Sequence, residues 1–176
     1  MHALDHNAGG PVDPRVLARF LEIERACPGN PASAHQLGRR ARAVVEDART
    51  QVAVALAVAV DDVVFCSGGT EANNLAVLGL GDRHKSVAMA PVEHPSVVEA
   101  ARARGIVWWR VDPEGLAQPE RTEQPPGLLC LVHAQSEVGA IQPVAVAAAL
   151  ADEMKVPLHV DAAQSLGRIA LGDVVR

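Results

Sequence analysis

The stretch VPLHVDAAQ, residues 156–164, is a short apolar run that ends in polar residues, with Asp161 at its end and Gln164 three residues later. A run of this length predicts a buried strand. A carboxylate there would be costly to bury without a cationic or hydrogen-bonding partner. Asp161 is therefore either the N-cap of a following helix, with Gln164 completing a capping box, or part of a binding site.

Four apolar runs of similar length precede this one, and each is separated from the next by a loop or a helix-like stretch. They are DVVF at 62–65, SVAMA at 86–90, GIVWWRV at 105–111 and LLCLVH at 128–133. Strands that alternate with helices predict an α/β fold with a parallel-rich sheet covered on both faces. Between Ala41 and Leu56 the apolar residues recur at steps of three and four, which predicts a long amphipathic helix. Residues 113–127, rich in Pro and Glu, are typical of a surface excursion with little structure.

Polar groups follow four of the five runs. Because open α/β sheets place ligands beyond the carboxyl ends of their strands, these groups are predicted to share one pocket. They are the segments Cys66 to Glu71, Glu93 to Pro95, His133 to Glu137, and Asp161 to Gln164.

The segment SGGTEANNLAVLG, residues 67–79, joins a run to a helix through two glycines and Thr70. Free N–H groups at the helix start, the helix dipole and a hydroxyl would together bind a phosphate group. The alternative is an ordinary helix capped by Ser or Thr. The segment matches neither the GxxxxGK[ST] phosphate loop nor GxGxxG.

Two histidines stand at positions that suggest chemistry. His94 precedes Pro95, which predicts that His94 caps a helix and carries a neutral ring; a purely structural histidine is the alternative. His159 and Asp161 share one face of a strand, but no third metal ligand is placed by spacing, so we expect no metal site.

Composition excludes several classes of function. The net charge of −5, the absence of Tyr and the presence of only two Trp and two Phe argue against a nucleic-acid partner. Cys27, Cys66 and Cys130 have no zinc-type spacing and fit the reduced thiols of a cytoplasmic protein. The longest apolar run, residues 52–60, is too short to span a bilayer, so we expect no membrane segment.

Six segments resemble, in family order, the cysteine desulfurase branch of the class V aminotransferases, which use pyridoxal 5′-phosphate. The resemblance implies the incomplete large domain of a fold-type I enzyme, with residues 1–35 as an N-terminal segment and residues 36–176 as a partial cofactor-binding domain. It also implies a homodimer that converts L-cysteine to L-alanine and passes sulfur to an acceptor protein for iron–sulfur cluster or thio-cofactor synthesis. The segments are LDHNAGGPVDPRV, GNPASAHQLGRRAR, VVFCSGGTEANNLAVLG, EHPSVVE, SEVGAIQPV and HVDAAQSLGR.

The resemblance assigns roles to five residues already singled out. Gly69 and Thr70 would bind the cofactor phosphate. His94 would stack on the pyridine ring and assist proton transfer. Asp161 would pair with the protonated pyridine nitrogen, and Gln164 would hydrogen-bond the phenolic oxygen.

Several departures from the family pattern bear on activity. Gly9-Gly10 replaces Thr-Thr, Cys66 replaces Thr or Ser, and Ser136 stands where an asparagine contacts the cofactor and is too short for the same reach.

Neither Lys85 nor Lys155 occupies the position of the Schiff-base lysine. The sulfur-accepting cysteine and the C-terminal arginine that binds the substrate carboxylate have no match either. We therefore expect a sequence truncated before the lysine, inactive as an isolated chain and prone to association. A non-catalytic relic or pairing module, and another class V chemistry such as selenocysteine lysis, stay open as alternatives.

Overall fold

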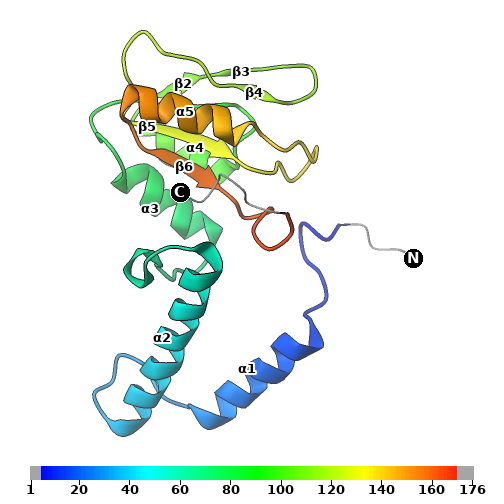
Figure 1. Ribbon diagram of the computed structural model, residues 1–176, viewed down its shortest axis with the longest axis vertical. Helices are drawn as coiled ribbons and strands as arrows, with labels where there is room; N and C mark the ends of the chain where they lie inside the picture. The colour runs from blue at the N-terminus through cyan, green and yellow to red at the C-terminus, as the bar shows by residue number, and fades with distance from the viewer. Residues whose placement is uncertain (1–4, 170–176) are drawn as a thin grey trace. The chain divides into compact units, whose positions relative to one another are not determined.

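The computed structural model describes residues 5–169 and divides into two compact units, Met1–Phe65 and Cys66–Arg176 (Figure 1). The second unit contains the whole of the main sheet and every predicted site residue. The boundary predicted after residue 35 concerns the domain of a complete enzyme, and it stays a prediction.

The first unit consists of helix α1 (Pro14–Ala26), helix α2 (Gln36–Leu56) and the short 3-10 turn η1 (Val60–Asp62). Helix α1 begins where the Asp13 carboxylate accepts the backbone N–H of Arg15, at 2.8 Å. Helix α2 contains the predicted amphipathic segment, so that prediction is confirmed.

The second unit contains a parallel sheet in the order β2-β1-β5-β6. Its strands are β1 (Val87–Met89), β2 (Ile106–Trp108), β5 (Leu128–Val132) and β6 (Leu158–Asp161). The helices of this unit are α3 (Gly69–Gly79), α4 (Pro95–Arg102) and α5 (Val144–Met154).

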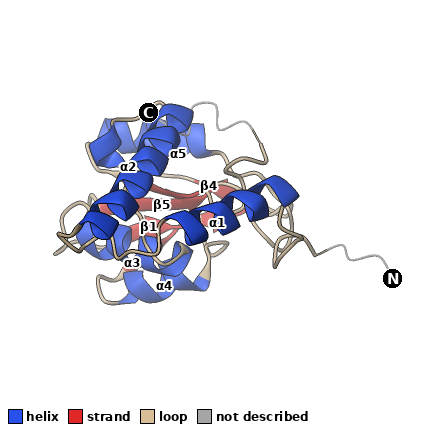
Figure 2. Ribbon diagram, turned by 90° about the horizontal axis from the view of Figure 1, so that it is seen from below, coloured by secondary structure: helices blue, strands red, loops and turns tan. Residues whose placement is uncertain are grey.

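The alternation of side chains along the strands divides the core into two layers. Ala88 and Leu129 belong to the cluster that contains the buried face of α5. Val87 and Met89 belong to the cluster that contains residues of α3 and α4. The sheet therefore lies between α5 on one face and α3 with α4 on the other, as Figure 2 shows. The predicted α/β fold with a helix-flanked parallel sheet is confirmed.

Two details of the sequence prediction were wrong. The run at 62–65 forms no strand, and the Arg49 guanidinium instead donates to the Val63 carbonyl and lies 4.9 Å from the centroid of the Phe65 ring. The run at 105–111 is broken at Trp109, which is buried and donates its indole N–H to a loop carbonyl. Beyond this break, β3 (Arg110–Val111) pairs antiparallel with β4 (Ala117–Gln118), so the excursion at 113–127 carries one short strand.

Within the described range no helix combines the length and apolar character needed to cross a bilayer. Cys27, Cys66 and Cys130 are free thiols. No cluster of three or more metal-ligating side chains was found among residues 5–169.

Candidate cofactor site at the carboxyl end of the sheet

A cavity of about 410 Å³ lies where β5 and β6 end and where the loop after β1 leads into α4. Of the six predicted site residues, four line this cavity: His94, Ser136, Asp161 and Gln164. The other two, Gly69 and Thr70, form the first turn of α3 and are not among its lining residues.

Asp161 is the last residue of β6 and is 9% exposed. One carboxylate oxygen accepts a hydrogen bond from Asn73 Nδ2 at 2.9 Å, and the other accepts the backbone N–H of Ala163 at 3.0 Å. Residues 163–168 form turns rather than a helix, and the Gln164 side chain accepts a bond from Arg168. The capping-box alternative therefore does not describe this segment, and the carboxylate has the hydrogen-bonding partners that its burial requires.

His94 is the N-cap of α4, as its position before Pro95 predicts. Its Nδ1 atom accepts the backbone N–H of Ser96 at 3.1 Å and lies 2.7 Å from the Ser96 hydroxyl oxygen. An Nδ1 atom that accepts a backbone N–H carries no proton, so this contact fixes a neutral ring with its hydrogen on Nε2.

The N-terminus of α3 has no side-chain cap, because Gly68 holds the N-cap position. Ser67 instead bonds to Glu71 through its backbone N–H and its hydroxyl, both at 2.6 Å, and these bonds lower the pKa of the Glu71 carboxyl. A Ser- or Thr-capped helix, the alternative reading of this segment, is not what the structure contains. The first N–H groups of the helix remain available to an anion.

The loop after β5 contributes Ser136 to the cavity. The loop is closed by the Gln135 side chain, whose carbonyl accepts the backbone N–H groups of Glu137 and Val138 at 2.6 and 2.8 Å. Gln135 thus supports the turn that carries Ser136.

Sequence reasoning missed one buried polar residue beside the cavity, Asn73. It included a second, Glu93, only as part of a segment predicted to share the pocket, and Glu93 does line the cavity. Asn73 is 4% exposed and lies one helical turn before Val77 on the buried face of α3. Glu93 is 7% exposed, accepts the backbone N–H of Val132 at 2.7 Å through one oxygen, and has no partner at the other. Burial, with a smaller contribution from nearby Asp161, raises the pKa of Glu93 to about 8. The sequence contained one indication of Asn73. It lies four residues before the apolar Val77, which places both residues on the same face of α3.

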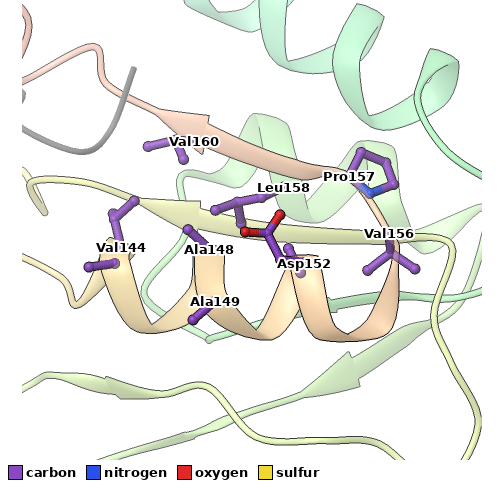
Figure 3. Close-up of a pocket in the computed structure, with 10 residues that line it drawn as sticks. Val144, Ala148, Ala149, Asp152, Val156, Pro157, Leu158 and Val160 are labelled. Carbon is purple, nitrogen blue, oxygen red and sulfur yellow. The ribbon is translucent and has the colours of Figure 1, made fainter. Parts of the chain in front are cut away.

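A second cavity, of about 430 Å³, lies between α5 and β6 (Figure 3). Mainly Ala and Val side chains line it, together with Asp152, and it contains no predicted site residue. Neither lysine of the chain lines the site cavity: Lys85 pairs with Asp82 at 3.6 Å, and Lys155 is the C-cap of α5.

The family model described as Aminotransferase class-V matches residues 2–172. The chain belongs to the class V aminotransferase family. Among curated class V relatives, the cysteine desulfurase IscS of Dictyoglomus turgidum is 32% identical, across 94% of this chain and 45% of its own length. The putative cysteine desulfurase IscS 1 of Bacillus subtilis is also 32% identical, across 96% of this chain and 48% of its own length. The chain thus spans about half the length of these relatives.

Solved structures show the same class V fold. The NifS-like protein from Rickettsia africae has a TM-score of 0.85 at 29% identity, with 96% of this chain and 50% of that chain covered. DndA from Streptomyces lividans has a TM-score of 0.78 at 35% identity, over 96% of this chain and 51% of its own. The parallel sheet and the order of its flanking helices are thus those of the matched half of a class V enzyme.

Proposed function

We propose that this chain is the cofactor-binding half of a cysteine desulfurase. Membership of the class V family and the similarity to two proteins named as cysteine desulfurases support the assignment. The observation that carries the assignment is the cavity at the carboxyl end of the sheet. The neutral His94 ring, the buried Asp161 carboxylate and the Gln164 amide all line this one cavity.

The chemistry of this lining fits pyridoxal 5′-phosphate. Asp161 would hold the protonated ring nitrogen, and the two N–H groups that its oxygens accept fix the orientation of the carboxylate. The neutral His94 ring would lie against the pyridine face, and Gln164 would bond the phenolic oxygen. Gly69 and Thr70 would bind the phosphate at the uncapped start of α3. When bound, the cofactor supplies an electron-poor ring that stabilises negative charge at the substrate Cα.

The proposed substrate is L-cysteine. Its sulfur would pass to an acceptor thiol, so that L-cysteine and a thiol give L-alanine and a persulfide. Within the chain, His94 would orient the ring and move a proton at Nε2, and Asp161 would keep the ring nitrogen protonated. Ser136 lines the cavity and would reach the cofactor only through a bridging water.

The wider setting is proposed on the same basis. We infer a cytoplasmic homodimer that supplies sulfur to an acceptor protein for iron–sulfur cluster or thio-cofactor synthesis. Three free thiols without disulfide pairing support a reducing compartment.

Cofactor binding tests the proposal. The purified chain is titrated with pyridoxal 5′-phosphate, and binding is followed by equilibrium dialysis and absorbance. We expect saturable binding that Asp161→Ala weakens by about tenfold, because an ion pair with the ring nitrogen is lost. Asp152→Ala, at an exposed carboxylate of α5 outside the site, serves as the control. Equal affinity in the two variants would contradict the assignment.

Turnover by the chain alone is a separate prediction. Because both lysines lie outside the cavity lining, no lysine side chain of the described residues is placed to bond the cofactor covalently. We expect no sustained sulfide or alanine formation when the cofactor-saturated chain is given L-cysteine. Robust sulfide release would show that this interpretation of the lysines is wrong.

A further inference from the structure

A network of hydrogen bonds, centred on one buried side chain, joins α3, α4 and β6 beside the cavity. Asn73, on α3, is its centre. Its Nδ2 atom lies 2.9 Å from the Ser96 hydroxyl oxygen and 2.9 Å from the Asp161 carboxylate, and its Oδ1 atom lies 3.0 Å from His159 Nε2. Both polar atoms of this one carboxamide are therefore used.

The direction of each bond follows from the two ends of the network. At one end, His94 Nδ1 accepts a backbone N–H, so the Ser96 hydroxyl at 2.7 Å from the same atom must donate to it. The hydroxyl oxygen is then left to accept from Asn73. At the other end, the Asp161 carboxylate can only accept. The amide orientation of Asn73 is thus fixed, and its carbonyl faces a His159 Nε2 that carries the hydrogen.

We propose that Asn73 is a positioning residue of the cofactor site, linking His94 to Asp161 through its carboxamide. This inference rests on the roles proposed above for those two side chains. Asn73 donates to the Ser96 hydroxyl oxygen, which leaves the Ser96 hydroxyl hydrogen directed at His94 Nδ1. Asn73 also donates directly to one carboxylate oxygen of Asp161. The Asn73 contacts with Ser96 and Asp161 are part-buried and buried, so water cannot fully replace either bond when it is removed, whereas the Ser96–His94 contact is exposed.

Burial of His159 is consistent with this arrangement. Desolvation lowers the pKa of His159, against an opposing effect of Asp161, so the ring is neutral and donates to Asn73. The amide of Asn73 therefore lies between the His159 donor and the Asp161 acceptor.

The first test uses the chain without cofactor. Two-bond ¹⁵N–¹H correlation spectra report which nitrogen of each histidine carries the proton. In the unaltered chain we expect the hydrogen of both His94 and His159 on Nε2. In Asn73→Leu the Ser96 hydroxyl oxygen no longer accepts a bond from residue 73, so the hydroxyl is no longer held as a donor to His94 Nδ1. The Nδ1 signal of His94 should therefore shift, while the backbone N–H of Ser96 keeps the proton on Nε2.

Asn74→Leu is the matched control, because Asn74 lies on the same helix and its amide bonds to the Thr70 carbonyl. A residue that only stabilised the fold would leave the His94 Nδ1 signal unchanged. An unchanged His94 spectrum in folded Asn73→Leu would therefore overturn the proposal.

Ser96→Ala decides the matter if Asn73→Leu does not fold. This variant removes the link to His94 and keeps the Asn73 bonds to His159 and Asp161. The Nδ1 signal of His94 should then shift while the His159 signals stay as in the unaltered chain. No shift at His94 would contradict the proposed link.

The second test measures affinity for pyridoxal 5′-phosphate. We expect Asn73→Leu to weaken binding by about tenfold and Asn74→Leu by less than about twofold. If the unaltered chain binds no cofactor, the proposed function fails, whereas the spectra still decide the role of Asn73. If the unaltered chain binds and Asn73→Leu binds equally well, the positioning role fails and the proposed function stands.

Discussion

Glu93 precedes the proposed ring-contacting histidine and is nearly inaccessible to water. Only one of its carboxyl oxygens has a partner, and Asp161 is close enough to affect its ionisation. A protonated Glu93 avoids placing a second buried negative charge beside Asp161. We infer that the native chain keeps this proton near neutral pH, so that Glu93 adds no negative charge beside Asp161.

The raised pKa of Glu93 predicts how stability depends on pH. An unfolded glutamate loses its proton near about pH 4.3, whereas the folded chain retains it up to about 8. The unfolded state therefore binds fewer protons over this interval, and the contribution of Glu93 to the free energy of unfolding falls as the pH rises. The loss is about 1 kcal/mol for each pH unit.

Glu93→Gln keeps the shape and removes the titration. Urea unfolding between about pH 6 and pH 8 should show the variant gaining stability over the unaltered chain as the pH rises. Glu99→Gln, on the exposed face of α4, should show no such gain. Parallel pH profiles for the unaltered chain and Glu93→Gln would refute the assignment of a buried protonated acid.

At the scale of single residues, the sequence supported those predictions that depend only on residues nearby in the chain. The N-cap position of His94 followed from Pro95, and the strand-end position of Asp161 followed from the apolar run before it. Asn73 could not be found in this way, because its partners Ser96 and Asp161 lie 23 and 88 residues away. Only the packing of α3 against α4 and β6 brings them together.

At the scale of elements, Arg104 stabilises the connection between α3 and β1. Its guanidinium donates to the carbonyls of Val77, Leu80 and Asp82, at distances between 2.6 and 3.1 Å, and to that of Lys85 at 3.2 Å. Carbonyls at the end of a helix and in the following loop otherwise lack partners. One side chain thus provides hydrogen-bond donors for the carbonyl groups at the end of α3 and in the loop that leads into β1.

Replacing Arg104 should destabilise the second unit. Arg104→Met removes all four bonds, and we expect a loss of about 2–3 kcal/mol in the free energy of unfolding. Arg102→Met, two residues earlier, breaks one exposed ion pair with Glu99 and should cost less than about 0.5 kcal/mol. Thermal and urea unfolding of both variants provide the comparison. Equal stability of the two variants would mean that the Arg104 bonds contribute little.

The order of helices and strands was predictable from periodicity, whereas their exact ends depended on tertiary contacts. The run at 105–111 is continuous in sequence, yet the buried indole of Trp109 divides it between two sheets. The run at 62–65 has the composition of a strand, but it has no strand partner and its Phe65 ring is covered by Arg49. Neither outcome is encoded in the local pattern.

At the scale of the whole molecule, β6 stands at one end of the strand order in the described sheet. Beside it lies the cavity between α5 and β6, whose lining side chains are mostly Ala and Val (Figure 3). An unpaired strand edge next to apolar surface favours contact with other chains. We therefore expect the purified chain to associate as its concentration rises.

Sedimentation velocity over a range of concentrations measures this association. Ala149→Glu places a charge on α5 at the cavity and should reduce association, whereas Ala43→Glu, at an exposed position of α2, should not. A stable, monodisperse monomer at every concentration would contradict the prediction.

The central claim is that the carboxyl end of this sheet binds pyridoxal 5′-phosphate. A crystal structure of the chain grown with the cofactor tests it most directly. The account predicts the ring against His94, its nitrogen within hydrogen-bond distance of Asp161, and its phosphate at the first turn of α3. Cofactor bound instead in the cavity between α5 and β6, or absent from a fully accessible site at saturating concentration, would contradict it.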